Sequence, residues 1–197
     1  LLTGVLALSG FGAAPAVATS VVEGPMAAPQ DTDRPALSRL VQGTLNIASG
    51  ERVVIRRQSD GSFVMDQARF VGTDAVIPDM DDPSTLSMTA EPGTVVITLG
   101  GRQDTGSLLK IENGLDQYFS YAGYIVRISN RQPVGPHRTS VCTVMPGKLG
   151  IEHWPEPVIQ MVMGGLETVE GQAPVCESPD VNEPVTPPAD RTGPPTA

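Results

Sequence analysis

The stretch TLSMTAEPGTVVITL, residues 85–99, decides the fold class. Two runs with a strand-like pattern, 85–90 and 94–99, flank the turn residues at 91–93. Pro92 fixes φ, and Gly93 supplies the positive φ that a type II turn requires. The stretch therefore predicts two antiparallel strands joined by a tight turn.

Similar short runs continue on both sides of this turn. They cover residues 44–47, 53–57, 62–65, 108–112, 118–128, 140–145, 149–152 and 158–163. Strand and helix patterns do not alternate along the chain, which argues against a parallel α/β fold. We therefore expect a mainly β fold, an antiparallel immunoglobulin-like β-sandwich that buries one face of each sheet.

Turn residues and glycines predict how some of these runs connect. Residues 48–51 (ASGE) predict a hairpin between 44–47 and 53–57, and residues 58–61 (QSDG) predict a second hairpin. Imperfect alternation along 118–128 predicts a bulge near Gly123. The pair Gly164 and Gly165 predicts a bend in the last strand.

Composition separates an ordered body from its ends. The 197 residues include 21 Gly and 19 Pro, with 4% aromatic and 18% charged residues, which excludes coiled-coil, helical-repeat and collagen classes. We expect a signal-peptide remnant at 1–18, a flexible lead-in with a short helix at 19–43 and a β-sandwich domain at 44–170. Residues 171–197 are acidic and rich in proline, so we expect a disordered tail there.

Residues 1–18 carry no charge and begin with an apolar run too short to span a bilayer. Ala16-Val17-Ala18 is typical of a signal-peptidase cleavage site after such a run. The segment therefore predicts export to the periplasm or secretion from a bacterial cell. The alternative is a buried apolar strand or helix, against which the Gly, Ala and Pro content argues.

The lead-in contains one helix signal. Asp33 is a suitable N-cap and Pro35 suits the first turn, while Leu37 and Leu40 fall on one helical face. Gly43 ends the segment, so one or two helical turns are expected between residues 33 and 43.

The net charge of −9 limits the classes of partner. An acidic chain repels the phosphate backbone, so nucleic-acid binding is excluded, and no basic block is present for anionic lipid. After residue 18 no apolar stretch is long enough for a transmembrane helix. We expect no integral membrane segment after cleavage, and a protein or cell-envelope partner of unknown identity.

Cys142 and Cys176 are the two cysteines of the chain. In an oxidising compartment an even number of cysteines is compatible with one disulfide, which would tie the start of the tail to the sandwich. We therefore expect a Cys142–Cys176 disulfide, and the alternative is two reduced thiols.

Copper binding is the sharpest chemical alternative. Thioether, imidazole and thiolate ligands select copper, and Met161 and Met163 fall on one face of a strand. His153 and Cys142 lie upstream as further candidates, together with His137 and Met145. The competing interpretation is that these methionines fill a core poor in aromatic residues.

A secreted hydrolase built around His137 or His153 is a second alternative. Ser140 lies three residues after His137, and Cys142 could pair with His153 only if it is reduced. No nucleophile elbow and no glycine-rich phosphate loop is present in the sequence. We therefore expect no catalytic residues and no cofactor.

Two further features have competing interpretations. Residues 79–82 (DMDD) offer oxygen ligands for Ca²⁺, but they lack the spacing of a calcium loop and are more typical of a solvated acidic loop. Trp154 is either an exposed anchor for a partner or sugar, or a core residue, and a lone tryptophan is more often a core residue.

Several motifs between residues 108 and 157 carry a resemblance to a known group. They are LKIENGLD (109–116), YFSY (118–121), TSVC (139–142), MPG (145–147) and EHWPEP (152–157). In these the chain resembles small exported bacterial proteins built from a single β-sandwich, a group without an assigned activity. The resemblance implies a periplasmic location and an immunoglobulin-like sandwich, and it carries over no catalytic residues. Together, the observations favour an exported, non-enzymatic binding or structural module.

Overall fold

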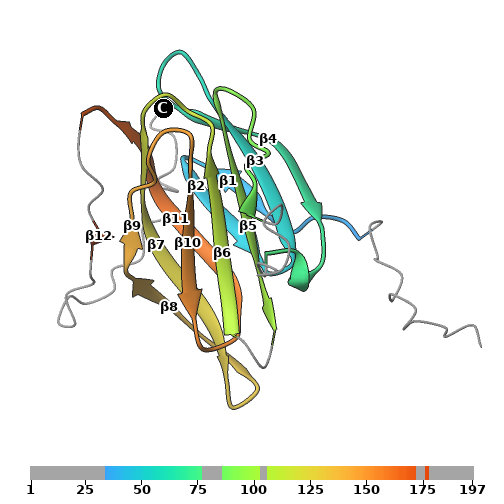
Figure 1. Cartoon of the computed structure of the whole chain (residues 1–197). Helices are drawn as coiled ribbons and strands as arrows, with labels where there is room; N and C mark the ends of the chain where they lie inside the picture. Colours follow the sequence, from blue (N-terminus) through green and yellow to red (C-terminus); the bar gives the residue numbers. More distant parts are fainter. Residues whose placement is uncertain (1–33, 77–85, 103–105, 172–175, 178–197) are drawn as a thin grey trace, which may run out of the picture.

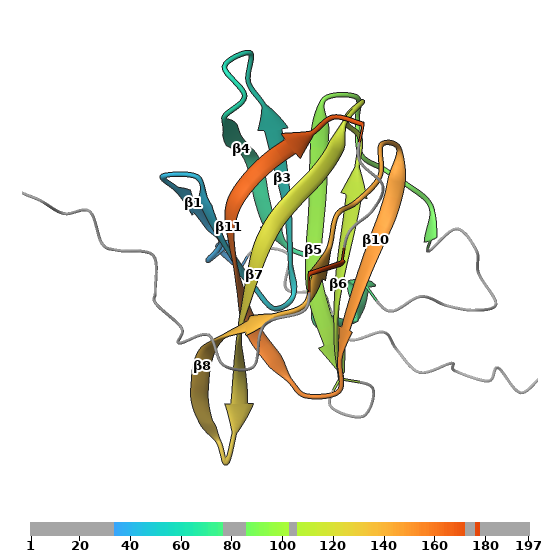
Figure 2. The same cartoon turned by 90° about the vertical axis from the view of Figure 1, so that its left-hand side faces the viewer.

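The computed structural model describes residues 34–76, 86–102, 106–171 and 176–177. The expected signal-peptide remnant at 1–18, the acidic loop at 79–82 and most of the expected tail lie outside these residues. Two antiparallel five-stranded sheets pack face to face (Figures 1 and 2). Their strands are β1 (Arg39–Val41), β2 (Thr44–Ala48), β3 (Glu51–Arg57), β4 (Phe63–Phe70), β5 (Thr94–Arg102), β6 (Gly106–Asn113), β7 (Tyr118–Ser129), β8 (Gln132–Thr139), β10 (Lys148–Trp154) and β11 (Val158–Val169).

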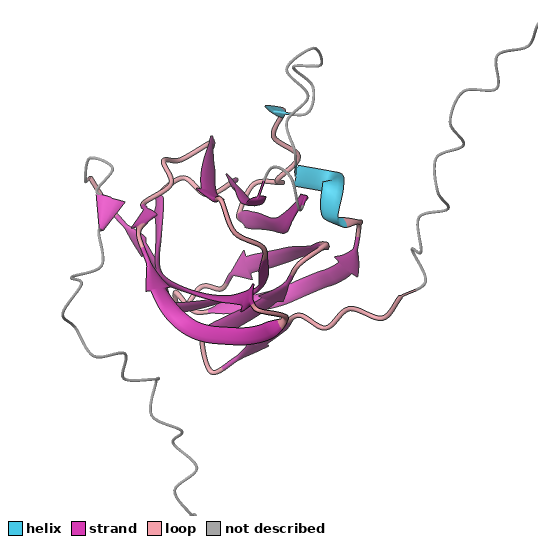
Figure 3. Ribbon diagram, turned by 90° about the horizontal axis from the view of Figure 1, so that it is seen from below, coloured by secondary structure: helices cyan, strands magenta, loops and turns pink. Residues whose placement is uncertain are grey.

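The strand order defines the two sheets. Sheet A has the order β1-β2-β11-β7-β8, and sheet B has the order β10-β6-β5-β3-β4. A small third sheet pairs β9 (Val141–Cys142) with β12 (Cys176–Glu177). Apart from a short 3-10 helix, η1 (Thr73–Val76), strands dominate the described chain (Figure 3). The expected mainly β, antiparallel two-sheet architecture is confirmed.

Alternating side chains from both sheets form one core. On β3 and β5 the inward positions Val53, Ile55, Val95, Ile97 and Leu99 are fully buried. Sheet A contributes Leu45, Ile47, Phe119, Met161 and Met163 to the same cluster. This two-residue period places the intervening residues of each strand on the outer face of its sheet, where a site can form.

The predicted hairpin across residues 48–51 is wrong, because the chain crosses between the sheets there. The Ser49 amide donates to the Ile159 carbonyl of sheet A at 2.9 Å. The next amide, that of Gly50, donates to the Leu99 carbonyl of sheet B at 2.7 Å. The hairpin predicted at 58–61 is confirmed, since β3 pairs with β4.

The short helix expected between residues 33 and 43 is also wrong. Residues 39–41 form β1, which pairs with β2 through a tight turn at Gln42 and Gly43. Both turn residues have positive φ, 49° and 75°, as a type I′ hairpin turn requires. The sandwich therefore begins with β1, earlier than the predicted boundary at residue 44.

Other local predictions have mixed outcomes. Residues 86–90 are not a strand, whereas the turn at Pro92-Gly93 and strand β5 are confirmed. β7 alternates regularly through Gly123, and its register breaks against β8 between Ile125 and Arg127 rather than at the glycine. The predicted bend at Gly164-Gly165 coincides with a register break against β7.

Cys142 and Cys176 form a disulfide that joins β9 to β12. The two residues lie directly opposite each other in the antiparallel pair, with a Cα–Cα distance of 4.0 Å. Within the expected tail, residues 176–177 therefore form a strand on the sandwich, and residues 178–197 lie outside the described residues.

Candidate functional site

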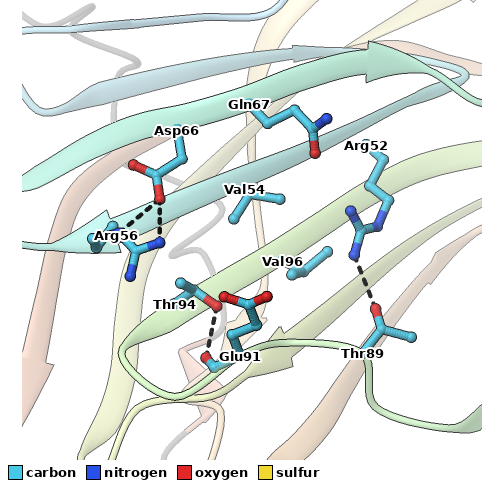
Figure 4. Close-up of a pocket in the computed structure, with 9 residues that line it drawn as sticks. All are labelled: Arg52, Val54, Arg56, Asp66, Gln67, Thr89, Glu91, Thr94 and Val96. Carbon is cyan, nitrogen blue, oxygen red and sulfur yellow. Dashed lines mark hydrogen bonds and ion pairs between the residues drawn. The ribbon is translucent and has the colours of Figure 1, made fainter.

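A groove of about 250 Å³ lies on the outer face of sheet B, over strands β4, β3 and β5 (Figure 4). We call it the arginine groove. Its lining comprises Arg52, Val54, Arg56, Asp66, Gln67, Thr89, Glu91, Thr94 and Val96.

Two valines on neighbouring strands form the floor of the groove. Val54 of β3 is the register partner of Val96 on β5. Val96 is only 2% exposed, although it faces away from the sandwich core. The accessible apolar surface of the floor therefore comes from the partly buried Val54, while Val96 closes the floor beneath it.

One end of the groove holds an ion pair that a β-bulge positions. Val54 pairs with Gln67 and Ile55 with Met65, so Asp66 is the extra residue on β4. A bulge directs adjacent side chains to one face, and both Asp66 and Gln67 line the groove. Asp66 accepts from Nε and Nη2 of Arg56, each at 2.7 Å, so the Arg56 charge is compensated.

The other end holds Arg52, four residues before Arg56 on the same strand face. Its Nη2 donates to Thr89 Oγ1 at 2.9 Å, a neutral acceptor. Burial lowers the pKa of the Arg52 guanidinium, the negative charge of Glu112 opposes this, and Arg69 adds to the lowering. An arginine stays protonated despite such a shift, so the groove contains a partly desolvated cation.

Glu112 positions the segment that carries Thr89. Its carboxylate accepts from the Thr89 backbone amide, from Thr89 Oγ1 at 2.9 Å and from the Ala90 amide at 3.0 Å. Lys110 Nζ lies 3.1 Å from the other carboxylate oxygen. Burial raises the pKa of Glu112, but the bonds from Thr89 and Lys110 lower it more, so the pKa lies below its ordinary value. An ionised Glu112 thus holds this wall of the groove.

The turn at residues 91–93 positions Glu91. Its carbonyl accepts from the Thr94 amide at 3.1 Å and from Thr94 Oγ1 at 2.7 Å. Gly93 has φ of 82°, as the type II turn predicted from Pro92-Gly93 requires. In Figure 4 the Glu91 carboxylate points into the groove, between the Arg56–Asp66 pair and Arg52.

The structure does not bring the predicted copper ligands together. Met161 and Met163 are fully buried in the core on β11 of sheet A. His153 is exposed on β10 of sheet B, and Cys142 is bonded to Cys176. In the described part of the chain, no group of three His, Cys, Asp or Glu side chains forms a metal site.

The hydrolase residues are likewise separated. His137 lies on edge strand β8, opposite Ile125, whereas His153 lies on β10 in the other sheet. Cys142 has no thiol, because its sulfur is in the disulfide. Trp154 is 8% exposed and donates from Nε1 to Thr139 Oγ1 at 2.8 Å, which confirms its prediction as a core residue.

Sequence reasoning missed the arginine groove. The only local signal is the spacing of Arg52, Val54 and Arg56, which places two cations on one strand face around an apolar residue. Asp66, Thr89 and Glu91 come from other segments, and only the folded sheet brings them to the same place.

Comparison of the chain with protein-family models, curated proteins and solved structures found no significant match. In the described residues, no helix has both the length and the apolarity needed to cross a membrane. The chemistry of the groove therefore carries the functional conclusion.

Proposed function

We propose that this chain is an exported, non-enzymatic binding module with an immunoglobulin-like β-sandwich, which holds a carboxylate-bearing partner in the arginine groove. One observation carries the proposal: Arg52 lies partly desolvated beside an apolar floor, with a neutral hydroxyl as its hydrogen-bond partner. A guanidinium binds carboxylates through two parallel hydrogen bonds, and desolvation strengthens that contact. Most ligand sites combine an apolar surface with a few polar groups in this way.

The binding test uses a probe with a single charge. The blocked peptide acetyl-Gly-Ala-Asp-Ala-Gly-amide carries one carboxylate, and its Asn counterpart carries none. We expect the Asp peptide, but not the Asn peptide, to shift the backbone amide resonances of Val54, Thr94 and Val96. Mass spectrometry after incubation should recover the peptide intact, as a binding module requires. Equal shifts with both peptides would contradict carboxylate recognition.

Variants of one strand supply the control for this titration. Arg52→Gln removes the positive charge of Arg52 while keeping a side chain of similar length. Arg57→Gln removes an exposed arginine of β3 that does not line the groove. We expect the first variant to lose the response to the Asp peptide and the second to keep it.

Export is proposed from the cleavage motif at residues 16–18 and is supported by the disulfide. Structural disulfides persist in oxidising compartments and are rare in the bacterial cytosol. The test adds a membrane-permeable alkylating reagent to intact native cells before lysis and then counts the modified cysteines. Unmodified Cys142 and Cys176 are expected, and two alkylated cysteines would overturn the proposed location.

A further inference from the structure

Four charged side chains line the arginine groove, and two of them form an ion pair with each other. We call the other two, Arg52 and Glu91, the positive and the negative pole. Arg56 is matched by Asp66 at 2.7 Å. Arg52 bonds to the neutral Thr89, and the nearby Glu112 is itself paired with Lys110. Glu91 lines the same groove with an exposed side chain that points into it (Figure 4). The groove thus offers one cation and one anion to a ligand.

The two poles are anchored close together along the chain. Thr89 holds the Arg52 guanidinium, and Glu91 follows two residues later. Two residues span at most about 7 Å between their Cα atoms, so Thr89, which holds Arg52, and Glu91 are close neighbours in the lining of the groove. Thr89 is held by Glu112, and the backbone carbonyl of Glu91 is held by the turn to Thr94. A ligand that pairs with both needs one negative and one positive group.

We infer that the arginine groove binds a short peptide with free ends, its terminal carboxylate on Arg52 and its terminal ammonium near Glu91. This inference rests on the proposed binding function and names its ligand class. An extended dipeptide carries both charges in one molecule, about 7 Å apart. Its small side chains would cover Val54 and Val96, the apolar floor between the poles. A volume of about 250 Å³ accommodates such a molecule but not a folded partner domain.

Three probes separate the two poles. Alanyl-alanine carries both charges, N-acetyl-alanyl-alanine carries only the carboxylate, and alanyl-alanine amide carries only the ammonium. The full chain is titrated with each probe, and dissociation constants are taken from the amide shifts of Val54, Thr94 and Val96. We expect alanyl-alanine to bind about tenfold more tightly than the acetylated probe, and the amide to bind most weakly.

Two variants assign each pole to its residue. Glu91→Gln should lower the affinity for alanyl-alanine to that for the acetylated probe, and should not weaken binding of the acetylated probe. Arg52→Gln should weaken both by about tenfold or more. The matched controls are Glu167→Gln and Arg57→Gln. Glu167 is an exposed carboxylate on β11 of the other sheet, and neither control should change the affinity for either probe.

The outcomes distinguish the inference from the proposed function. If both carboxylate probes bind equally and Arg52→Gln weakens both, the groove recognises carboxylates and the dipeptide inference is overturned. If alanyl-alanine, N-acetyl-alanyl-alanine and the blocked Asp peptide all leave the groove resonances unmoved, the inference and the proposed function fail together. Tighter binding of alanyl-alanine that Glu91→Gln abolishes supports both.

Discussion

Glu112 and Glu152 lie on neighbouring strands of sheet B and attach two irregular segments in different ways. Glu112 on β6 faces outward and accepts from the Thr89 and Ala90 amides, which keeps residues 86–91 on the sheet. Glu152, on edge strand β10, is the register partner of the core residue Leu109 and accepts from the Cys142 amide at 3.0 Å. Both are carboxylates removed from bulk water, but their surroundings differ in the number of donors.

The pKa values of the two carboxyls shift in opposite directions. Hydrogen bonds to Glu112 outweigh the cost of its burial, so its pKa is lowered. Burial dominates at Glu152, and the one bond from Cys142 does not offset it, so its pKa is raised. Three bonds from Thr89 and Ala90 hold their segment on Glu112, whereas Glu152 receives one bond from β9, and the disulfide attaches β12 to that same strand.

The largest effect is expected from removing the covalent attachment. The double variant Cys142→Ser/Cys176→Ser opens a loop with a sequence separation of 34 residues. In the chain-entropy model this costs about 4 kcal/mol of stability. Urea unfolding of the variant, compared with the oxidised and the reduced wild-type chain, measures it. The reduced wild type should match the variant, and a variant as stable as the oxidised chain would show that the bond does not stabilise the sandwich.

The next largest effect is expected at Glu112. Glu112→Ala leaves the amides of Thr89 and Ala90 without their acceptor and removes one ion-pair partner of Lys110, and Glu112 is only 2% exposed. Breaking such a buried charged network costs about 3 kcal/mol. Urea unfolding gives the loss, and amide hydrogen exchange at Thr89 and Ala90 shows whether residues 86–91 detach. Glu91→Ala, at an exposed position, should change stability by less than about 0.5 kcal/mol.

The opposite pKa shifts predict opposite pH dependences. Glu112 has a lowered folded pKa, so its stabilisation is present above the ordinary value of 4.5 and is lost as the pH falls through the folded pKa. Glu152 has a raised folded pKa, so acidification through that pKa towards 4.5 stabilises the fold. Each contribution is limited to about 1.4 kcal/mol per pH unit.

Glu112→Gln and Glu152→Gln isolate these contributions. Urea unfolding between pH 7 and pH 3.5 gives the stability difference between wild type and each variant. On acidification, the stability advantage of the wild type over Glu112→Gln should shrink. The stability of the wild type relative to Glu152→Gln should instead rise. If the stability difference from the wild type changes with pH in the same direction for both variants, the pKa values of Glu112 and Glu152 are not shifted in opposite directions.

The smallest effect concerns Tyr121, beside Glu152. Its ring is buried and stacks on Phe119 at 5.7 Å, but its hydroxyl has no hydrogen-bond partner among the described residues. Burial raises the pKa of Tyr121, and the charge of Glu152 raises it further. Tyr121→Phe keeps the ring and removes the buried hydroxyl, so stability should stay equal or rise by up to about 1 kcal/mol. A loss above 1 kcal/mol in thermal or urea unfolding would mean that the hydroxyl is bonded.

The sequence predicted the parts of this fold that local residues determine. Gly61 and the Pro92-Gly93 turn specify their conformations directly, and both turns formed where expected. The crossing at Ser49-Gly50 was mistaken for a hairpin, because small turn residues suit both connections and the choice depends on β11 and β5. Strand β8 was missed because it contains Pro133 and Pro136, which an edge strand tolerates.

The candidate site was less accessible to sequence reasoning than the fold. Methionines and histidines were predicted as candidate copper ligands, but the two-residue period of the strand buries Met161 and Met163 in the core. The disulfide was predicted correctly, because two cysteines allow a single pairing within the chain. Glu91 could not be placed in the groove from sequence, since β3 and the loop before β5 meet only through the sheet register.

The Cys142–Cys176 bond also determines how a mechanical pull would travel through the molecule. Tension applied to the chain after residue 177 would reach β9 through the two sulfur atoms, bypassing β10 and β11. The enclosed loop could extend by on the order of 110 Å, and this length stays hidden while the bond is intact. The sandwich would then bear the load through β9, and β11 would not be pulled away from β7. Reduction of the disulfide would release the enclosed loop, so that the molecule changes from a stiff link into an extensible one.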